Sequence, residues 1–124
     1  MKNIKYILLI VLIAISFNTL EAQSGKQKAL FKLAKQEYSQ LRFAYAIPVI
    51  KQLLLTQPKD TNALLLLAKS YQKVNQIDSA VKYYDLASSS GVKYISDMAE
   101  VHAMLGNYEK AVQIYKQLID SNNL

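Results

Sequence analysis

Residues 61–88 read TNALLLLAKSYQKVNQIDSAVKYYDLAS, and the helical pattern of the chain is clearest in this stretch. On either side of residues 75–79, small and apolar residues recur at steps of three and four. The two runs are Leu64, Leu67, Ala68 and Tyr71, then Ala80, Val81, Tyr84 and Ala87. Such a period is typical of helices with one apolar face. The stretch therefore predicts two helices joined by a short turn.

The turn residues have chemical roles. Asn75 can adopt the left-handed conformation that closes the first helix. Asp78 or Ser79 can accept hydrogen bonds from the free amides that open the second helix. In a later copy of the turn Gly106 stands at the closing position, where a positive φ costs it nothing. In an earlier copy Leu41 stands there, so that copy lacks the usual glycine.

The same pattern occurs three times along the chain. Residues of the first two copies match at a spacing of 34, as in Leu30 and Leu64 or Phe43 and Ile77. The third copy is three residues short, and the deficit falls in the small-residue stretch 87–91, which predicts a tightened loop. In the first copy Pro48 is expected near the first turn of its helix. Pro58, with Asp60 and Thr61, is expected to end that helix and cap the next.

These residues resemble the tetratricopeptide repeat, a 34-residue helix–turn–helix family. The positions that fit the family pattern are Leu33, Ala34, Ala46, Pro58, Leu67, Ala68, Tyr71, Ala80, Tyr84, Ala99, Gly106, Tyr108, Ala111 and Tyr115. His102 stands where the pattern has Tyr, and we interpret it as a packed residue rather than a functional one. The resemblance implies an all-α fold, a right-handed superhelical α-solenoid of three repeats with about six helices. The repeats would span about 27–60, 61–91 and 92–122.

The N-terminal segment has the features of an export signal. Lys2 and Lys5 precede the uncharged run 6–20, which is shorter than the roughly 20 residues of a membrane span. Cleavage is predicted after Ala22 or after Ser24, which divides the chain into a signal peptide, 1–22, and a repeat domain, 23–124. The signal resembles those of Bacteroidetes, which implies a protein of the periplasm or the cell envelope, where association with the outer membrane is one alternative. After cleavage the protein would not be an integral membrane protein. An uncleaved signal anchor is the alternative.

The composition argues against most catalytic sites. The chain of 124 residues has no Cys and one His, so thiolate metal sites, multi-histidine zinc sites and histidine-based nucleophilic triads are excluded. We expect no catalytic, cofactor-binding or metal-binding residues. A small helical enzyme or ligand-binding protein remains a remote alternative.

The basic charge is confined to one repeat. The net charge is +6, and after removal of the signal all of the remainder lies in residues 23–60. There seven basic residues face two acidic ones, whereas residues 61–124 hold six of each sign. The chain has no recognisable nucleic-acid-reading motif and the signal removes it from the cytosol, so we expect no nucleic-acid partner.

Family geometry places one set of first-helix residues on the concave face. The candidate groove residues are Lys28, Phe31, Lys35, Tyr38, Leu65, Lys69, Gln72 and Lys93, with Asn62, Ser96, Glu100 and Ala103 beside them. The lysines and aromatic rings would suit an acidic or C-terminal peptide of a protein partner; the alternative is that the lysines only solvate a helix. The carboxylate clamp of chaperone-binding repeats is rejected, because only Lys93 fits it.

The last helix is expected to leave apolar surface uncovered. Its apolar residues have no following capping helix in the sequence, and they are Val112, Ile114, Tyr115, Leu118 and Ile119. This predicts a partner, a homodimer through Val112, Tyr115, Leu118 and Ile119, or a continuation of the chain. The leading interpretation is an exported, non-catalytic interaction module or scaffold. The alternative is an N-terminal fragment of a larger OmpA-like envelope protein, which the segment also resembles, without the parts that bind peptidoglycan.

Overall fold

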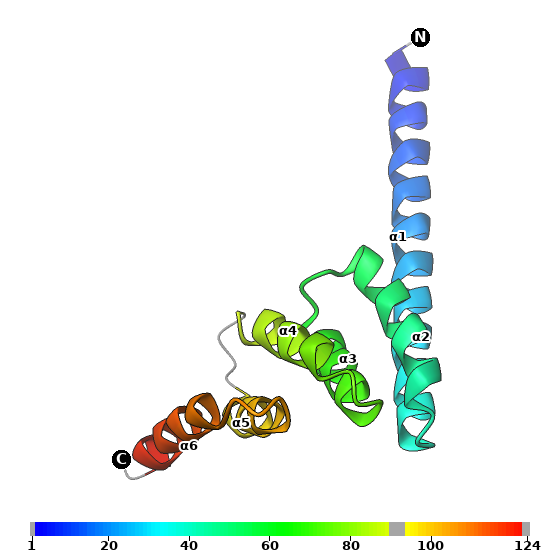
Figure 1. Cartoon of the computed structure of the whole chain (residues 1–124). Coiled ribbons are helices and arrows are strands. Elements are labelled where there is room, and N and C mark those ends of the chain that lie inside the picture. Colours follow the sequence, from blue (N-terminus) through cyan, green and yellow to red (C-terminus); the bar gives the residue numbers. More distant parts are fainter. Residues whose placement is uncertain (1, 90–93, 123–124) are drawn as a thin grey trace.

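The computed structural model describes residues 2–89 and 94–122, which form six α-helices and no strand (Figure 1). The helices are α1 (Lys2–Ser39), α2 (Phe43–Thr56), α3 (Thr61–Lys73), α4 (Ile77–Ser88), α5 (Ile95–Met104) and α6 (Tyr108–Asn122). They pack as the pairs α1–α2, α3–α4 and α5–α6, and each pair contacts the next through α2–α3 and α4–α5. The predicted all-α stack of about six helices is confirmed.

Small side chains set the spacing between the helices. One alanine of each helix is fully or almost fully buried at the predicted positions, namely Ala34, Ala46, Ala68, Ala80, Ala99 and Ala111. A methyl side chain lets two helix backbones approach closely, so the larger residues fill the spaces beside the contact. The largest fully buried side chains are Tyr84, Ile50, Leu53 and Leu67.

The turn inside each helix pair has the same geometry three times. Leu41, Asn75 and Gly106 have φ values of 60°, 60° and 79°. The amide after each of them donates to a carbonyl five residues back, as in Gln76 N to Tyr71 O at 2.9 Å. This is the Schellman pattern that satisfies the free carbonyls at a helix end. The predicted closing roles of Asn75 and Gly106 are confirmed, and Leu41 adopts the same conformation without being glycine.

The helix caps agree with the sequence in one case and differ in another. The side chain of Asp60 accepts from Ala63 N at 3.0 Å, as predicted for the start of α3. The predicted cap by Asp78 or Ser79 is wrong, because α4 begins at Ile77 and its N-cap is Gln76, which makes no side-chain cap bond. The Schellman turn passes directly into the helix, so Asp78 lies in its first turn.

Two further local predictions need correction. Pro48 is the sixth residue of α2 and lies in its second turn rather than its first. The loop predicted over 87–91 starts too early, since Ala87 and Ser88 belong to α4. Ser89 is the C-cap of α4. Residues 90–91 of that loop, the predicted repeat boundary at 91–92 and the groove candidate Lys93 lie outside the described residues.

Helix α1 runs without a break through the predicted signal peptide and into the first repeat (Figure 1). Its residues 2–26 are all exposed. The first covered residue is Gln27, which exchanges side-chain hydrogen bonds with Thr56 and Gln57 at the end of α2. By length and composition α1 could cross a membrane, a property that N-terminal signal sequences share.

Apart from the turn residues Pro58 and Gly106, which are also exposed, three predicted repeat positions are not part of the core. Leu33, Tyr108 and Tyr115 are exposed, although their counterparts Leu67, Ile77 and Tyr84 are buried. The three residues lie on α1 and α6, which are the end helices of the described stack. Each of these helices has a neighbour on one side only, so identical positions in the repeat pattern differ in burial.

Candidate functional site

The predicted groove residues on α1 and α3 form a partly open surface. Lys28 and Lys35 are exposed, and the other five described candidates are half-buried, namely Phe31, Tyr38, Leu65, Lys69 and Gln72. Among the residues considered beside them, Asn62, Ser96 and Glu100 are exposed and Ala103 is half-buried. The face thus offers both amines and apolar side chains to a partner.

Phe31 and Lys35 form the first part of this face. The Lys35 ammonium lies 5.9 Å from the centre of the Phe31 ring, which is at the outer limit of a cation–π contact. Phe31 is half-buried and packs against the core cluster. The side chain is therefore held in place while part of its ring remains accessible. A small pocket of about 180 Å³ adjoins it, lined in part by Lys28 and Phe31.

Tyr38 is the candidate groove residue nearest the C-terminal end of α1. Its ring meets Phe43 edge to face, with the ring centres 5.0 Å apart. Burial raises the pKa of the Tyr38 phenol, and the negative charge of Asp97 raises it further. Asp97 belongs to α5, so the electrostatic surroundings of Tyr38 include an acidic group of the third repeat.

The side chain of Gln72 contacts residues of two neighbouring helices. Its Oε1 accepts a hydrogen bond from the Tyr84 hydroxyl at 2.9 Å, and its Nε2 lies 3.8 Å from the Met104 sulfur. These contacts join α3 to α4 and α5. Burial raises the pKa of Tyr84 well above its usual range, with smaller contributions from Asp97, Tyr38 and Glu100. The Gln72 amide therefore joins α3 to its neighbours and supports the face.

The face has two electrostatic ends, which the sequence analysis did not recognise. Lys28 and Lys35 lie on α1 and Lys69 on α3, whereas the acidic side chains Asp97 and Glu100 lie on α5. Asp97 is half-buried and Glu100 is exposed, and both contribute to the raised pKa of Tyr84. The signal was present in the sequence, because Glu100 already stood at a concave position and Asp97 three residues before it.

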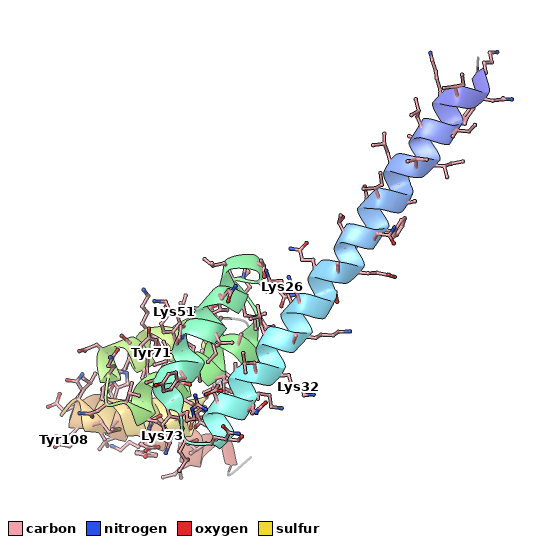
Figure 2. The ribbon with its side chains drawn as sticks, turned by 90° about the vertical axis from the view of Figure 1, so that its right-hand side faces the viewer. Lys26, Lys32, Lys51, Tyr71, Lys73 and Tyr108 are labelled. Atoms are coloured by element: carbon pink, nitrogen blue, oxygen red, sulfur yellow. The ribbon has the colours of Figure 1, made fainter. Side chains whose placement is uncertain are left out.

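A larger apolar pocket lies on the other side of the stack, between the second helices α2 and α4. It measures about 560 Å³ and is lined by Pro48, Lys51, Gln52, Leu54, Leu55, Pro58, Leu64, Tyr83 and Leu86. Figure 2 shows Lys51 projecting outward from the body there. No prediction covered this pocket, although exposed Leu55 and Pro48 on one helix were its signal.

The part of the chain that the structure describes contains no group of three or more His, Cys, Asp or Glu side chains that could hold a metal ion. His102 is half-buried, and its Nδ1 is enclosed without a hydrogen-bond partner among those residues. This environment agrees with the interpretation of His102 as a packed residue.

Comparison with known families identifies two of the repeats. Residues 61–90 and residues 97–122 each match a tetratricopeptide-repeat family. These ranges correspond to the second and third repeats.

Two curated proteins show the same relationship over a longer stretch. The chain is 31% identical over 105 residues to TPR repeat-containing protein MJ0263 of Methanocaldococcus jannaschii, which covers 78% of this chain and 31% of that protein. It is 35% identical over 75 residues to tetratricopeptide repeat protein 8 of Caenorhabditis elegans, covering 56% of this chain and 15% of that protein. The chain thus spans less than a third of either relative.

Solved structures share the fold. MamA of Desulfovibrio magneticus RS-1 superposes with a TM-score of 0.72 at 15% identity, over 77% of this chain and 56% of that one. The tetratricopeptide-repeat domain of Arabidopsis FLU gives 0.68 at 17% identity, over 81% of this chain and 97% of that domain. The predicted α-solenoid architecture is confirmed.

Proposed function

We propose that this chain of tetratricopeptide repeats is an exported, non-catalytic interaction module of the cell envelope that holds an acidic segment of a protein partner. Tetratricopeptide-repeat domains in general mediate protein–protein contacts and are not catalytic. The observation that carries the proposal is the set of half-buried Phe31, Leu65 and Lys69 beside exposed Lys28 and Lys35.

The arrangement favours an extended acidic peptide for two reasons. Leu65 and Lys69 are one helical turn apart on α3, so an apolar anchor and an amine point to the same side. Lys69 is half-buried, and an amine that has lost part of its water pairs more strongly with a carboxylate than an exposed one. A peptide lying across α1 and α3 could satisfy both contacts.

The acidic residues on α5 favour one orientation of a bound peptide on the face. A carboxylate placed near Asp97 or Glu100 would be repelled, whereas one near Lys35 or Lys69 would be attracted. The acidic part of the partner should therefore lie over α1 and α3, with a neutral or basic part toward α5.

A binding measurement with matched variants tests the groove. The probe is a fluorescently labelled peptide of alternating Glu and Leu, and its anisotropy is followed as protein is added. We expect Lys35→Glu and Lys69→Glu each to weaken binding by about tenfold or more. Lys51→Glu on α2 makes the same change of charge away from this face and should change binding little. Equal losses in all three variants would show that the protein attracts acidic peptides without a groove.

Export is the second part of the proposal. It is supported by the apolar character of α1 before Gln23 and by the complete exposure of residues 2–26. Fractionation of cells that express the full chain, followed by mass spectrometry of the intact protein, should find a periplasmic form that begins at Gln23 or Gly25. A chain that keeps Met1 and remains with the membranes would support the signal anchor instead.

The predictions about the C-terminal end belong to the same proposal. A homodimer through α6, and a continuation of the polypeptide into an OmpA-like region, each would cover the exposed side chains of that helix. The coding sequence downstream decides the second alternative, and the first is developed below into a specific geometry.

A further inference from the structure

Four positions recur in the second helix of every repeat and form a stripe along it. In α2 they are Phe43, Ile47, Ile50 and Leu54, in α4 they are Ile77, Val81, Tyr84 and Ser88, and in α6 they are Tyr108, Val112, Tyr115 and Ile119. All eight of these residues on α2 and α4 are buried or half-buried. All four on α6 are exposed, from 42% at Tyr115 to 68% at Tyr108. We call these four residues the α6 stripe.

The apolar residues that the sequence predicts to be uncovered on α6 divide into two groups, those in the stripe and those that face α5. Val112, Tyr115 and Ile119 are exposed as the sequence predicted, whereas Ile114 is buried and Leu118 half-buried because they face α5. Helix α4 packs between α3 and α5, and α2 packs between α1 and α3. The stripe of α4 reaches the following repeat, because Ser88 Oγ lies 3.6 Å from the Met98 sulfur on α5, while Tyr84 also bonds to Gln72 of its own pair. The α6 stripe is thus the counterpart of a surface that, in α4, contacts the first helix of the following repeat.

The opposite end of the stack exposes the counterpart of that surface. On α3, Ala63, Leu67 and Ser70 are fully buried between the neighbouring helices. The residues 34 positions earlier on α1 are Ala29, Leu33 and Gln36, and all three are exposed. We call these three residues the α1 face. Leu33 is 42% exposed and Leu67 is 0% exposed, although both are leucines at the same repeat position.

The two open surfaces lie at opposite ends of one arch. Figure 1 shows α1 at one end of the stack and α6 at the other, with the middle pair α3–α4 between them. A single molecule cannot bring the two surfaces together, but two molecules can.

Charge favours contact between unlike ends over contact between like ends. Lys26 and Lys32 lie at the edges of the α1 face, and Figure 2 labels both on the long helix. Along one edge of the α6 stripe lie Glu109, Lys116 and Asp120, all exposed. Contact of two α1 faces would oppose lysines to lysines, whereas contact of α1 with α6 opposes them to an edge with two carboxylates.

We infer that a second copy of this chain docks head to tail, with the α6 stripe of one molecule on the α1 face of the next. The contact continues the stack in the way that α2 holds α3 and α4 holds α5. It is heterologous, so each assembly keeps an open α1 face at one end and an open α6 stripe at the other, which permits chains longer than a dimer. The inference does not rest on the proposed peptide groove, which uses other residues.

Single variants on each surface test the inference. The full chain is expressed and purified in the form that the host leaves, and its mass is followed by sedimentation velocity over a range of concentrations. The wild type should grow beyond a dimer as concentration rises. Leu33→Glu and Val112→Glu should each weaken association by at least about tenfold, because a carboxylate would be buried without a partner. Leu55→Glu makes the same change at an exposed leucine of α2 and should associate as the wild type does.

Mixing the two defective variants gives the sharper result. Leu33→Glu keeps an intact α6 stripe, and Val112→Glu keeps an intact α1 face. In head-to-tail docking an equimolar mixture therefore forms a one-to-one heterodimer that cannot grow further. In a symmetric dimer through α6 alone, Leu33→Glu would dimerise normally and the mixture would form no heterodimer.

Each other outcome overturns the inference. A wild type that stays monomeric at all concentrations shows that a second copy does not cover the α6 stripe, and it assigns the stripe to a different partner or to further polypeptide. A symmetric dimer shows that α6 pairs with itself. At a concentration low enough for the wild type to be monomeric, circular dichroism and thermal unfolding of the variants should match the wild type, because all three substituted residues are exposed in the monomer.

Discussion

At the scale of single residues, the turn of each repeat poses the same conformational requirement to three different amino acids. Leu41, Asn75 and Gly106 all have positive φ. Glycine adopts this region freely and asparagine tolerates it, whereas a residue such as leucine loses about 1–2 kcal/mol through contact of its Cβ with the backbone. The first repeat thus folds in spite of its turn residue, because helix packing on both sides fixes the turn.

Substitutions at two of these turn positions should change the free energy of unfolding in opposite directions. Leu41→Gly should raise the free energy of unfolding by about 1 kcal/mol, since the strain is relieved and the Leu41 side chain is exposed. Gly106→Ala should lower it by about 1 kcal/mol. A Cβ at Gly106 would meet no atom within 4 Å, so that loss reports backbone strain alone. Chemical denaturation measures both, and a loss in Leu41→Gly would show that its side chain contributes more than its exposure indicates.

Tyr84 makes the stability sensitive to high pH. Its pKa is raised in the folded protein above the ordinary value of 10.0, mainly by burial. The folded state therefore keeps a proton that the unfolded state releases, so the stabilisation is complete below pH 10 and is lost as the pH rises above it. Tyr38 shifts in the same direction.

Removing the Tyr84 hydroxyl should isolate this effect. Tyr84→Phe should lose about 1 kcal/mol at neutral pH, because Gln72 Oε1 loses its donor. Its thermal stability should then fall less steeply than that of the wild type between pH 10 and 11. Tyr45→Phe, at an exposed tyrosine of α2, serves as the control and should follow the wild type. Parallel curves for all three proteins would show that Tyr84 does not control the alkaline transition.

At the scale of elements, the helices differ in how their ends are satisfied. Helix α3 begins with the Asp60 side chain bonded to the amide of Ala63, whereas α4 begins at Gln76 without such a bond. A side-chain cap satisfies one of the amides that have no partner within the helix. The two helices therefore offer a matched pair for measuring the effect.

The caps should respond in opposite directions to substitution. Asp60→Ala should destabilise the protein by about 1 kcal/mol, and Gln76→Asp should stabilise it by about 0.5–1 kcal/mol. Urea denaturation with circular dichroism at the helical band measures both changes. No gain in Gln76→Asp would show that the Schellman turn before α4 prevents the side chain from reaching the helix amides.

The sequence predicts helices well where apolar periodicity and turn residues agree. The pairs α3–α4 and α5–α6 follow from that agreement, and Asp60 was identified as a cap. The continuity of α1 did not follow, because a change of composition at residues 21–25 was interpreted as a boundary. Gly25 inside a helix costs only about 1 kcal/mol relative to alanine, so it does not end the helix. Processing and helix formation are separate properties of that segment.

At the scale of the whole molecule, burial depends on neighbours that a repeat pattern does not specify. Leu33 and Leu67 occupy equivalent positions, yet only Leu67 lies between two helices. The polarity of the candidate groove has the same origin, since the acidic residues of α5 and the lysines of α1 and α3 belong to one surface only through the stacking of the helix pairs. The kind of each element was predictable from its own residues, whereas exposure and charge pattern required the assembled stack.

The stack should also unfold unevenly. In repeat proteins each repeat is stabilised by its neighbours, so an end repeat opens more readily than the middle. Helix α3 has six buried residues, whereas the described part of α6 buries only Ala111 and Ile114. Hydrogen exchange followed by mass spectrometry should therefore show faster exchange in α5 and α6 than in α3 and α4. With head-to-tail docking, exchange in α6 and in residues 27–39 of α1 should slow as protein concentration rises, while Val112→Glu should abolish that dependence. Uniform protection along the chain at every concentration would contradict both the weak end and the docking.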